Sequence, residues 1–297
     1  MEGADEKGVT LLLVDVQKDF HPGGSLAIPT ADEDAERIAR LIRTHPHKIN
    51  KIIATLDSHH KLHIAHPRFW TSPETNKNPS PFTIISHQDL LDGKWKPTVT
   101  TKKGLPPGID TVVLSTTSTT SSSPPRSIEE YVLEYTRRLE EKGRFQLCVW
   151  PEHCLLATDG HSMVDAVRSA IDDWSVLTGR SPRFLQKGTN NWTEMYSAIQ
   201  AEVPVNHETS LNTQLLHELM DDDNILLVCG QAMSHCVNYT LRDIVQHWKD
   251  PSALQHVCLL TDCASPVPTF ETAATQLQQD MKEAGVTLTT SDRVFGE

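Results

Sequence analysis

Residues 9–14 read VTLLLV and are followed by Asp15, so a short run of leucine and β-branched residues ends on a carboxylate. Residues 49–56 read INKIIATL and are followed in the same way by Asp57. Such short runs of leucine and β-branched residues are typical of strands buried on both faces of a parallel sheet. Between them, residues 32–43 carry apolar positions at helical spacing, with acidic residues first and basic residues last. The segment therefore predicts a strand, a helix and a second strand.

The same alternation continues along the chain. Further apolar runs at 111–114, 146–149, 225–228 and 257–260 predict strands, and helical patterns cover 128–142, 164–177, 211–220, 234–247 and 271–284. Strands that alternate with helices predict a mainly parallel sheet covered by helices. In sheets of this kind the chemistry lies beyond the carboxyl ends of the strands, so we expect functional residues there.

The composition limits the class of partner. The chain has 297 residues, of which 38% are hydrophobic, and can bury one large core or two smaller ones. Its formal net charge of −12 argues against nucleic acid as a partner, because phosphate binding needs clustered positive charge. No apolar run approaches the roughly 20 residues that cross a bilayer, and six scattered cysteines indicate reduced thiols. We therefore expect a cytoplasmic protein that binds no membrane.

One region interrupts the alternation of strands and helices. From 65 to 100 the chain is rich in Pro, Asn, Ser, Trp and Lys without a clear period, and residues 115–125 read STTSTTSSSPP. The Ser/Thr tract is typical of a flexible exposed loop. Neither an internal repeat nor a sharp change of composition marks a second domain.

A histidine cluster follows the second predicted strand. In LDSHHKLHIAHPRFW, residues 56–70, Asp57 and His59 are two apart at a strand end, so their side chains point to one side and can reach one metal ion. His153, in VWPEHC, follows another predicted strand and is a candidate third ligand. Two imidazoles and a carboxylate around a divalent metal form a common catalytic arrangement. The alternative is a solvated histidine-rich loop, since the chain also carries His45, His47, His60 and His66.

Three further residues carry candidate catalytic groups. Cys236 follows a predicted strand and a short polar link, at the start of a predicted helix whose dipole would lower the pKa of the thiol. Asp15 can accept a thiol proton and return it to a leaving amine. Lys187 ends an apolar stretch and is either a buried cation beside these groups or a surface lysine, and its local sequence favours the surface position.

These residues occur in the order and company seen in a known family. The segments VDVQKDFHPGGSL (14–26), TLDSHH (55–60), WPEHC (150–154), QKGTNNWTEMYSA (186–198) and CGQAMSHCV (229–237) resemble the successive motifs of the nicotinamidase and isochorismatase-like cysteine hydrolases. The resemblance covers nearly the whole chain, because the tail TDCASPVPTF (261–270) also suits the family. It implies a three-layer α/β/α fold with a mainly parallel, doubly wound sheet, in one domain over residues 8–297. Residues 65–145 then form an insertion, including the loop at 115–125, that lines or covers the pocket.

The resemblance also implies a reaction. Cys236, Asp15 and Lys187 would form a triad that hydrolyses an amide, in the first place nicotinamide to nicotinate and ammonia, through a Cys thioester. The backbone N–H groups of Ala232 and Cys236 would bind the oxyanion, next to a cis bond between Gln231 and Ala232.

A metal and an aromatic pocket are implied in the same way. The ligands would be Asp57, His59 and His153, with His63 as a candidate fourth, and the metal would be divalent: zinc in the first place, with iron or manganese as alternatives. The metal would bind the pyridine nitrogen of the substrate. Phe20 and Trp150 would sandwich the ring. Family members often form homo-oligomers.

Two departures from the family keep alternatives open. The segment between His63 and Trp150 is much longer than in most members, and Ser58 and His60 replace an aromatic residue and a proline. An altered cover would admit another small amide or a carbamoyl substrate on the same triad. An isochorismatase proper is disfavoured, because it would leave the cysteine and the metal histidines unexplained. The non-enzymatic alternative is a degenerate binding scaffold, against which the retained triad and ligands argue.

Overall fold

A six-stranded parallel sheet forms the centre of the computed structural model, which describes residues 8–99, 104–116, 124–220 and 224–296. The strands lie in the order β10–β9–β8–β1–β2–β7. Their bounds are β1 Gly8–Val14, β2 Ile49–Asp57, β7 Arg183–Lys187, β8 Asn224–Gly230, β9 Val257–Leu260 and β10 Thr287–Thr289. All neighbouring strands are parallel, and the chain order changes direction at β1, where ligands bind in sheets of this type.

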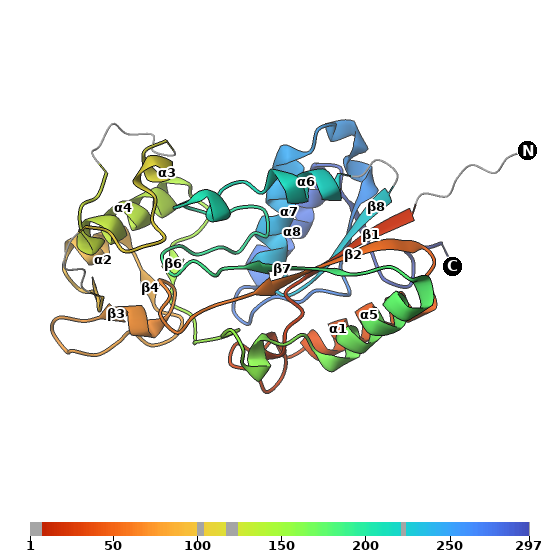
Figure 1. Ribbon diagram of the computed structural model, residues 1–297, viewed down its shortest axis with the longest axis horizontal. Helices are drawn as coiled ribbons and strands as arrows, with labels where there is room; N and C mark the ends of the chain where they lie inside the picture. The colour runs from red at the N-terminus through yellow and green to blue at the C-terminus, as the bar shows by residue number, and fades with distance from the viewer. Residues whose placement is uncertain (1–7, 100–103, 117–123, 221–223, 297) are drawn as a thin grey trace, which may run out of the picture.

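Helices cover both faces of this sheet (Figure 1). The helices α1 (Ala31–Thr44) and α5 (Asp165–Thr178) lie on one face, and α6 (Thr213–Leu219), α7 (Cys236–His247) and α8 (Glu271–Glu283) lie on the other. Successive side chains of β1 face opposite sides of the sheet. Leu11 and Leu13 pack in the core with α1 and α5, whereas Leu12 and Val14 pack in the core on the other face. The predicted three-layer, doubly wound α/β fold is confirmed.

The insertion at 65–145 lies beside the carboxyl ends of the strands, at the left of Figure 1. It contains a 3₁₀ turn at Pro67–Phe69, β3 (Trp70–Thr71), β4 (Ile84–Ile85), α2 (His87–Leu91), β5 (Lys96–Pro97), α3 (Thr111–Thr116) and α4 (Ile128–Glu141). The buried face of α4 belongs to the same core as β1 and α7, which supports our proposal that residues 8–297 form one domain. Most of the predicted Ser/Thr loop, 117–123, lies outside the described residues.

Two strand predictions were wrong. Residues 111–114 begin α3 instead, because the carboxylate of Asp110 accepts the N–H of Val112 and starts a helical turn. Residues 146–149 form only the short β6 (Leu147–Cys148), which pairs antiparallel with β4 of the insertion and lies outside the central sheet. His153 therefore comes from a loop after a peripheral strand. The edge strand β10, in contrast, was not predicted.

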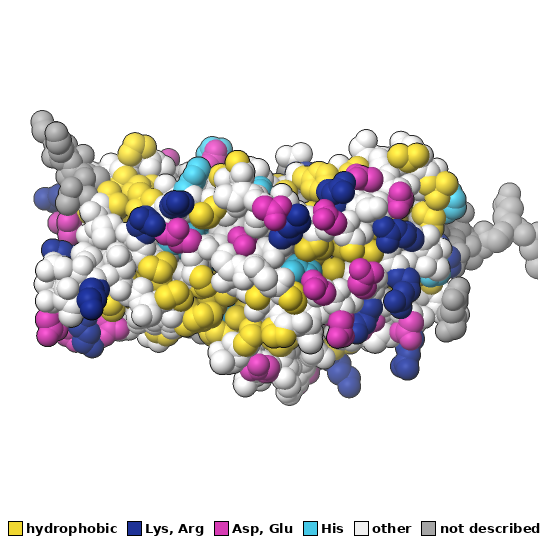
Figure 2. Space-filling view, turned by 90° about the horizontal axis from the view of Figure 1, so that it is seen from below, with side chains coloured by type: hydrophobic (Ala, Val, Ile, Leu, Met, Phe, Trp, Pro, Cys, Tyr) yellow, Lys and Arg dark blue, Asp and Glu magenta, His cyan; other side chains and the backbone are white. Residues whose placement is uncertain are grey.

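The face that carries α1 and α5 has intermixed charges. Figure 2 shows basic and acidic side chains alternating there, and several form ion pairs, such as Arg37 with Glu33 and Arg168 with Asp172. This face therefore presents no single-sign patch. Among the described helices, none has the length and apolar character needed to span a membrane.

A buried acidic cluster joins α7 to the segment after α4. The side chains of Glu202 and Asp243 are 1% and 0% exposed, and the Arg144 guanidinium lies 3.4 Å from the first and 2.9 Å from the second. Burial, with a contribution from Asp243, outweighs Arg144 and raises the pKa of Glu202 to about 7. In the folded protein Glu202 therefore holds its proton at pH values where the unfolded chain has lost it.

We expect Glu202→Gln to remove part of the pH dependence of folding. Since the folded-state pKa is raised, the stabilising contribution is complete below pH 4.5 and declines up to about pH 7, by at most about 1.4 kcal/mol per pH unit. Glutamine cannot ionise, so the variant should exceed the wild type by about 1–3 kcal/mol at pH 8 and show little gain at pH 5. Urea denaturation at both pH values tests this, with the exposed Glu208→Gln as control. An equal gain at both pH values would contradict the assignment.

Candidate active site

Four side chains meet at the carboxyl edge of the sheet. Asp15 follows β1, Asp57 ends β2, Lys187 ends β7, and Cys236 is the first residue of α7, shortly after β8. The strand register places Asp57 directly beside Lys187. Because neighbouring parallel strands end at one edge, residues far apart in the sequence come together here.

Lys187 lies at the centre of this group. Its Nζ is 2.9 Å from Asp15 Oδ2, 3.0 Å from Asp57 Oδ1 and 3.5 Å from Cys236 Sγ, and it donates to the carbonyl of Met195 at 3.1 Å. Only 3% of the residue is exposed, so the surface position favoured by its local sequence was wrong. Burial alone would lower the pKa of Lys187, but the two carboxylates and the thiol outweigh it and raise the pKa well above its usual value. The lysine is therefore a fixed positive charge.

The thiol and its neighbouring carboxyl are both deprived of water. Burial raises the pKa of Cys236 well above its usual value, although Lys187 acts to lower it. The expectation that the helix N-terminus would lower this pKa was therefore wrong, because desolvation dominates. Burial likewise raises the pKa of Asp15, against the opposing effect of Lys187. Asp15 accepts a hydrogen bond from Thr55 Oγ1 at 2.6 Å, and it also acts to raise the pKa of Cys236, so it is placed to take the thiol proton.

The turn after β8 brings backbone N–H groups to the same place. Gly230 has φ 116°, and a Cβ on it would lie 2.0 Å from the carbonyl oxygen of Val14, so only glycine allows this approach to β1. The Gln231–Ala232 bond is cis, as the resemblance implied. Ala232 and Cys236 both line the cavity, and the N–H of Cys236 is among the first in α7, which lack a carbonyl partner within the helix.

Two histidines converge on Asp57. The Nδ1 atoms of His59 and His153 face the carbonyls of Gly188 and Pro151 at 3.0 and 2.8 Å, and their Nε2 atoms lie 3.0 and 3.3 Å from Asp57 Oδ2. Carbonyl partners keep the proton on Nδ1 and leave the Nε2 lone pairs available to a metal. A Cβ on Gly188 would come within 2.8 Å of the His59 ring, so the glycine after Lys187 makes room for this cluster.

His66 belongs to this cluster and is not one of the solvated histidines. One ligand atom each of His59, His66 and His153 lies within 4.8 Å of the others, and Nε2 of His66 is buried with no hydrogen-bond partner among the described residues. His63 packs on His59 at 4.4 Å between ring centroids, but its Nδ1 accepts the N–H of Ala65, so the proton stays on Nε2. The geometry favours His66 over His63 as the additional ligand. The three imidazoles and the carboxylate fit a divalent metal.

A narrow cavity opens between this cluster and the thiol. Its apolar and aromatic walls are Phe20, Leu26, Trp150, Tyr196, Ala232, His235 and Val267, and its polar lining is Asp57, His153, Glu194 and Cys236. Phe20 and Trp150 both line this cavity, and their contact with a substrate ring stays a prediction. Trp150 Nε1 donates to the Tyr196 hydroxyl at 2.9 Å, and burial lowers the pKa of His235 to about 3, so its ring is neutral.

Sequence reasoning missed Tyr196, His235 and Glu194. Tyr196 and His235 stood inside the quoted motifs, but their local pattern did not distinguish a pocket wall from ordinary core. The lining residues all lie outside 65–145, so within the described part of the chain the insertion does not line the cavity. It supports the walls from behind, since the Phe82 ring packs on Trp150 at 5.8 Å and the Phe145 ring on Tyr196 at 4.6 Å.

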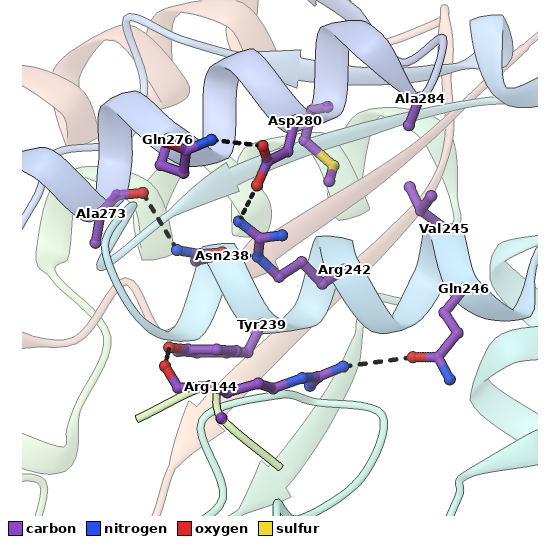
Figure 3. Close-up of a pocket in the computed structure, with 12 residues that line it drawn as sticks. Arg144, Asn238, Tyr239, Arg242, Val245, Gln246, Ala273, Gln276, Asp280 and Ala284 are labelled. Carbon is purple, nitrogen blue, oxygen red and sulfur yellow. Dashed lines mark hydrogen bonds and ion pairs between the residues drawn. The ribbon is translucent and has the colours of Figure 1, made fainter. Parts of the chain in front are cut away.

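A larger hollow of about 1160 Å³ lies between α7 and α8. Figure 3 shows that its polar side chains pair with one another, Arg242 with Asp280, Asp280 with Gln276 and Arg144 with Gln246. Its described lining residues include neither cysteine nor histidine. The thiol and the histidine cluster lie at the smaller cavity instead.

The fold is a doubly wound parallel sheet with buried Cys, Lys and Asp side chains at its carboxyl edge. No family model matches the chain. The sequence is 25% identical over 232 residues to the nicotinamidase of Saccharomyces cerevisiae, covering 78% of each protein. A solved structure of yeast nicotinamidase has 20% identity and a TM-score of 0.57, covering 94% of this chain and 98% of that one.

Two further solved structures have the same fold. A nicotinamidase/pyrazinamidase of Acinetobacter baumanii has a TM-score of 0.59 at 18% identity, covering 97% of this chain and 99% of that one. A pyrazinamidase of Pyrococcus horikoshii in complex with zinc has a TM-score of 0.50 at 19% identity, covering 95% and 98%. The chain is thus similar in sequence to a nicotinamidase and shares its fold with solved nicotinamidases and pyrazinamidases.

Proposed function

We propose that the protein is a metal-dependent amidohydrolase that converts nicotinamide and water to nicotinate and ammonia. The observation that carries the proposal is the contact of the Lys187 ammonium with both Asp15 and Cys236 beside an aromatic cavity. The named activity of the yeast relative supports nicotinamide as the substrate. A flat aromatic amide suits the cavity, whose walls include Phe20 and Trp150.

The first half of the reaction forms a thioester. Asp15 takes the proton of the Cys236 thiol, and Lys187 stabilises the thiolate that forms. The sulfur attacks the amide carbonyl, and the N–H groups of Ala232 and Cys236 bind the resulting oxyanion. Asp15 then returns the proton to the amide nitrogen, the C–N bond breaks, and ammonia leaves.

The second half releases the acid. Asp15, again ionised, takes a proton from a water molecule, whose oxygen attacks the thioester carbonyl, and the same two N–H groups bind the second oxyanion. The C–S bond breaks, nicotinate leaves, and the proton on Asp15 returns to Cys236. Lys187 keeps its charge throughout, which agrees with the direction of its pKa shift.

A divalent metal, zinc in our proposal, would be held by Asp57, His59, His153 and His66. When bound, it would supply a Lewis acid for the pyridine nitrogen of the substrate and so fix the orientation of the ring. The buried, unpartnered Nε2 of His66 and the Nε2 atoms of His59 and His153 support this donor set. The pyrazinamidase of Pyrococcus horikoshii, whose structure is a complex with zinc, supports the choice of metal.

We further propose that the enzyme acts in the cytoplasm, in the recovery of nicotinamide for NAD synthesis. The six described cysteines are all free, which agrees with a reducing compartment.

An amide panel tests the substrate. Ammonia release is measured with nicotinamide, pyrazinamide, benzamide and a carbamoyl compound in the presence of zinc. Highest kcat/KM on nicotinamide supports the proposal. Hydrolysis of only other amides would reject nicotinamide and keep the chemistry, whereas hydrolysis of none would favour a binding scaffold.

Metal content tests the ligand assignment separately. We expect Asp57→Ala, His153→Ala and His66→Ala to lose bound metal, roughly 10–100-fold in affinity or more. His63→Ala is the matched control and should keep it, because Nε2 of His63 carries a proton in the geometry described. Elemental analysis of the purified variants gives the result. Full occupancy in His153→Ala would reject the assignment, and loss in His63→Ala alone would restore His63 in place of His66.

A further inference from the structure

Helix α4 of the insertion reaches the segment that follows Lys187. The Tyr131 hydroxyl donates to the carbonyl of Trp192, and the Tyr135 hydroxyl accepts the N–H of Glu194 at 3.0 Å. Both tyrosines are almost completely buried, at 0% and 1% exposure. These hydrogen bonds therefore form away from water, where they are costly to leave unmade.

Other parts of the insertion hold the same segment. The indole N–H of Trp192 donates to the carbonyl of Pro107 at 2.9 Å, and the side-chain amide of Asn190 donates to the carbonyl of Gly108 at 2.9 Å. The Trp192 ring also packs on Phe69 at 5.8 Å. Residues 188–196 thus run from the lysine to the pocket wall in contact with the insertion.

The residues at the end of this segment take part in the site. Glu194 lines the cavity, is 3% exposed, and accepts the N–H of Met195 on its own Oε1 at 3.0 Å. The carbonyl of Met195 in turn accepts from Lys187 Nζ at 3.1 Å. The Tyr135 hydroxyl therefore fixes the backbone that carries both the pocket carboxyl and a partner of the lysine.

We propose that Tyr135 is a positioning residue through which the insertion sets the place of Glu194 in the pocket wall and of the Met195 carbonyl on Lys187. The inference rests on the proposed amide hydrolysis and assigns the insertion a part in it from behind the wall. Without the hydroxyl, the buried N–H of Glu194 has no acceptor, and the backbone has to turn to find one.

Tyr135→Phe tests the proposal, because it keeps the ring and removes only the hydroxyl. We expect kcat/KM on the best amide of the panel to fall roughly tenfold, the size typical of one unmade buried hydrogen bond. Both kcat and KM should change, because the segment carries the Met195 carbonyl that contacts Lys187 and also the Glu194 side chain that lines the pocket. The matched control is Tyr239→Phe, which removes a hydroxyl that contacts the carbonyl of Arg144 outside the cavity, and it should stay within twofold of wild type.

A double-mutant cycle separates positioning from general destabilisation. If Tyr135 acts through Glu194, Tyr135→Phe and Glu194→Gln are expected to be non-additive, the double variant losing no more than about twofold beyond the stronger single variant. Tyr239→Phe combined with Glu194→Gln should give the product of the two single effects. A Tyr135→Phe enzyme within twofold of wild type, or effects of Tyr135→Phe and Glu194→Gln that multiply, would overturn the proposal.

Two further arrangements keep the test decisive. If Tyr135→Phe does not fold, as thermal melting would reveal, Tyr131→Phe takes its place in the cycle, with the same expected and overturning results. If the wild type hydrolyses no amide, the proposed function fails, but the positioning role of Tyr135 can still be tested. The test is then the rate at which iodoacetamide alkylates Cys236, measured by mass spectrometry. Tyr135→Phe should then change that rate at least threefold and Tyr239→Phe should not, whereas equal rates would overturn the inference.

Discussion

Replacing Cys236 by alanine is expected to lower amide hydrolysis by about 10⁴-fold or more, because a covalent mechanism without its nucleophile keeps only binding and oxyanion stabilisation. The thiol lies 3.5 Å from Lys187 Nζ, which in turn lies 2.9 Å from Asp15 Oδ2. Released ammonia, measured in a coupled assay at saturating nicotinamide, gives the ratio. Bound metal should not change, since Cys236 lies outside the ligand set.

The matched control for this prediction is Cys258→Ala. Cys258 is also a buried free thiol, but it lies in β9 and does not line the cavity. It should cost some stability through lost packing and leave kcat within about twofold. Activity above one-hundredth of wild type in Cys236→Ala would reject the thioester mechanism, and an equal loss in Cys258→Ala would point to a folding defect common to both.

The sequence predicted the strand ends well, and with them most of the site. Asp15 and Asp57 each follow a run rich in leucine and β-branched residues, and the parallel geometry alone requires such residues to share one edge of the sheet. The position of the Lys187 side chain was less certain from the sequence. A lysine that follows apolar residues gives the same pattern whether its ammonium lies in water or contacts two buried carboxylates. Only the register, which sets Lys187 beside Asp57, decides between them.

What the sequence did not predict depends on tertiary contacts. His66 lies in an irregular turn, where no period shows which way a side chain points, and its membership of the cluster follows only from the folded path of residues 60–66. The apolar run at 146–149 found a partner in the insertion strand β4 and left the central sheet. The pKa of Cys236 was predicted from the helix dipole alone, whereas its complete burial, which sequence does not reveal, has the larger effect.

The insertion illustrates a third kind of limit. Its unusual length suggested a cover over the pocket, but the described part of the insertion contacts the pocket walls and the segment after Lys187 from behind. Sequence length shows that extra chain exists, but not on which side of a wall it packs. The tyrosines of α4 have helical spacing, and this spacing alone suggests only an ordinary core.

Lys187→Met is expected to abolish activity and to destabilise the fold as well. The ammonium is the positive partner of two buried carboxylates, Asp15 and Asp57, and its removal leaves both uncompensated. Breaking a buried ion pair from one side typically costs about 3–5 kcal/mol. Activity should fall by about 10³-fold or more, since neither the thiolate nor the ionised form of Asp15 is then stabilised. Urea denaturation and the ammonia assay measure the two effects, with the exposed Lys282→Met as control.

The pH dependence of this loss distinguishes lost charge from lost packing. In the wild type, burial acts to raise the pKa of Asp57, but His59 and Lys187 outweigh it and hold that pKa well below its usual value, so the stability gained from the carboxylate is present above about pH 4 and declines as the pH falls. In Lys187→Met the pKa of Asp15, already raised by burial in the wild type, should rise further, and the pKa of Asp57 should rise because it keeps only its histidine partners. The variant then gains stability as the two carboxyls take up protons. The difference between wild type and variant should therefore shrink from pH 7 to pH 5, and adding Asp15→Asn should restore part of the stability without restoring activity. A difference that is constant with pH would assign the loss to packing and reject the charged cluster.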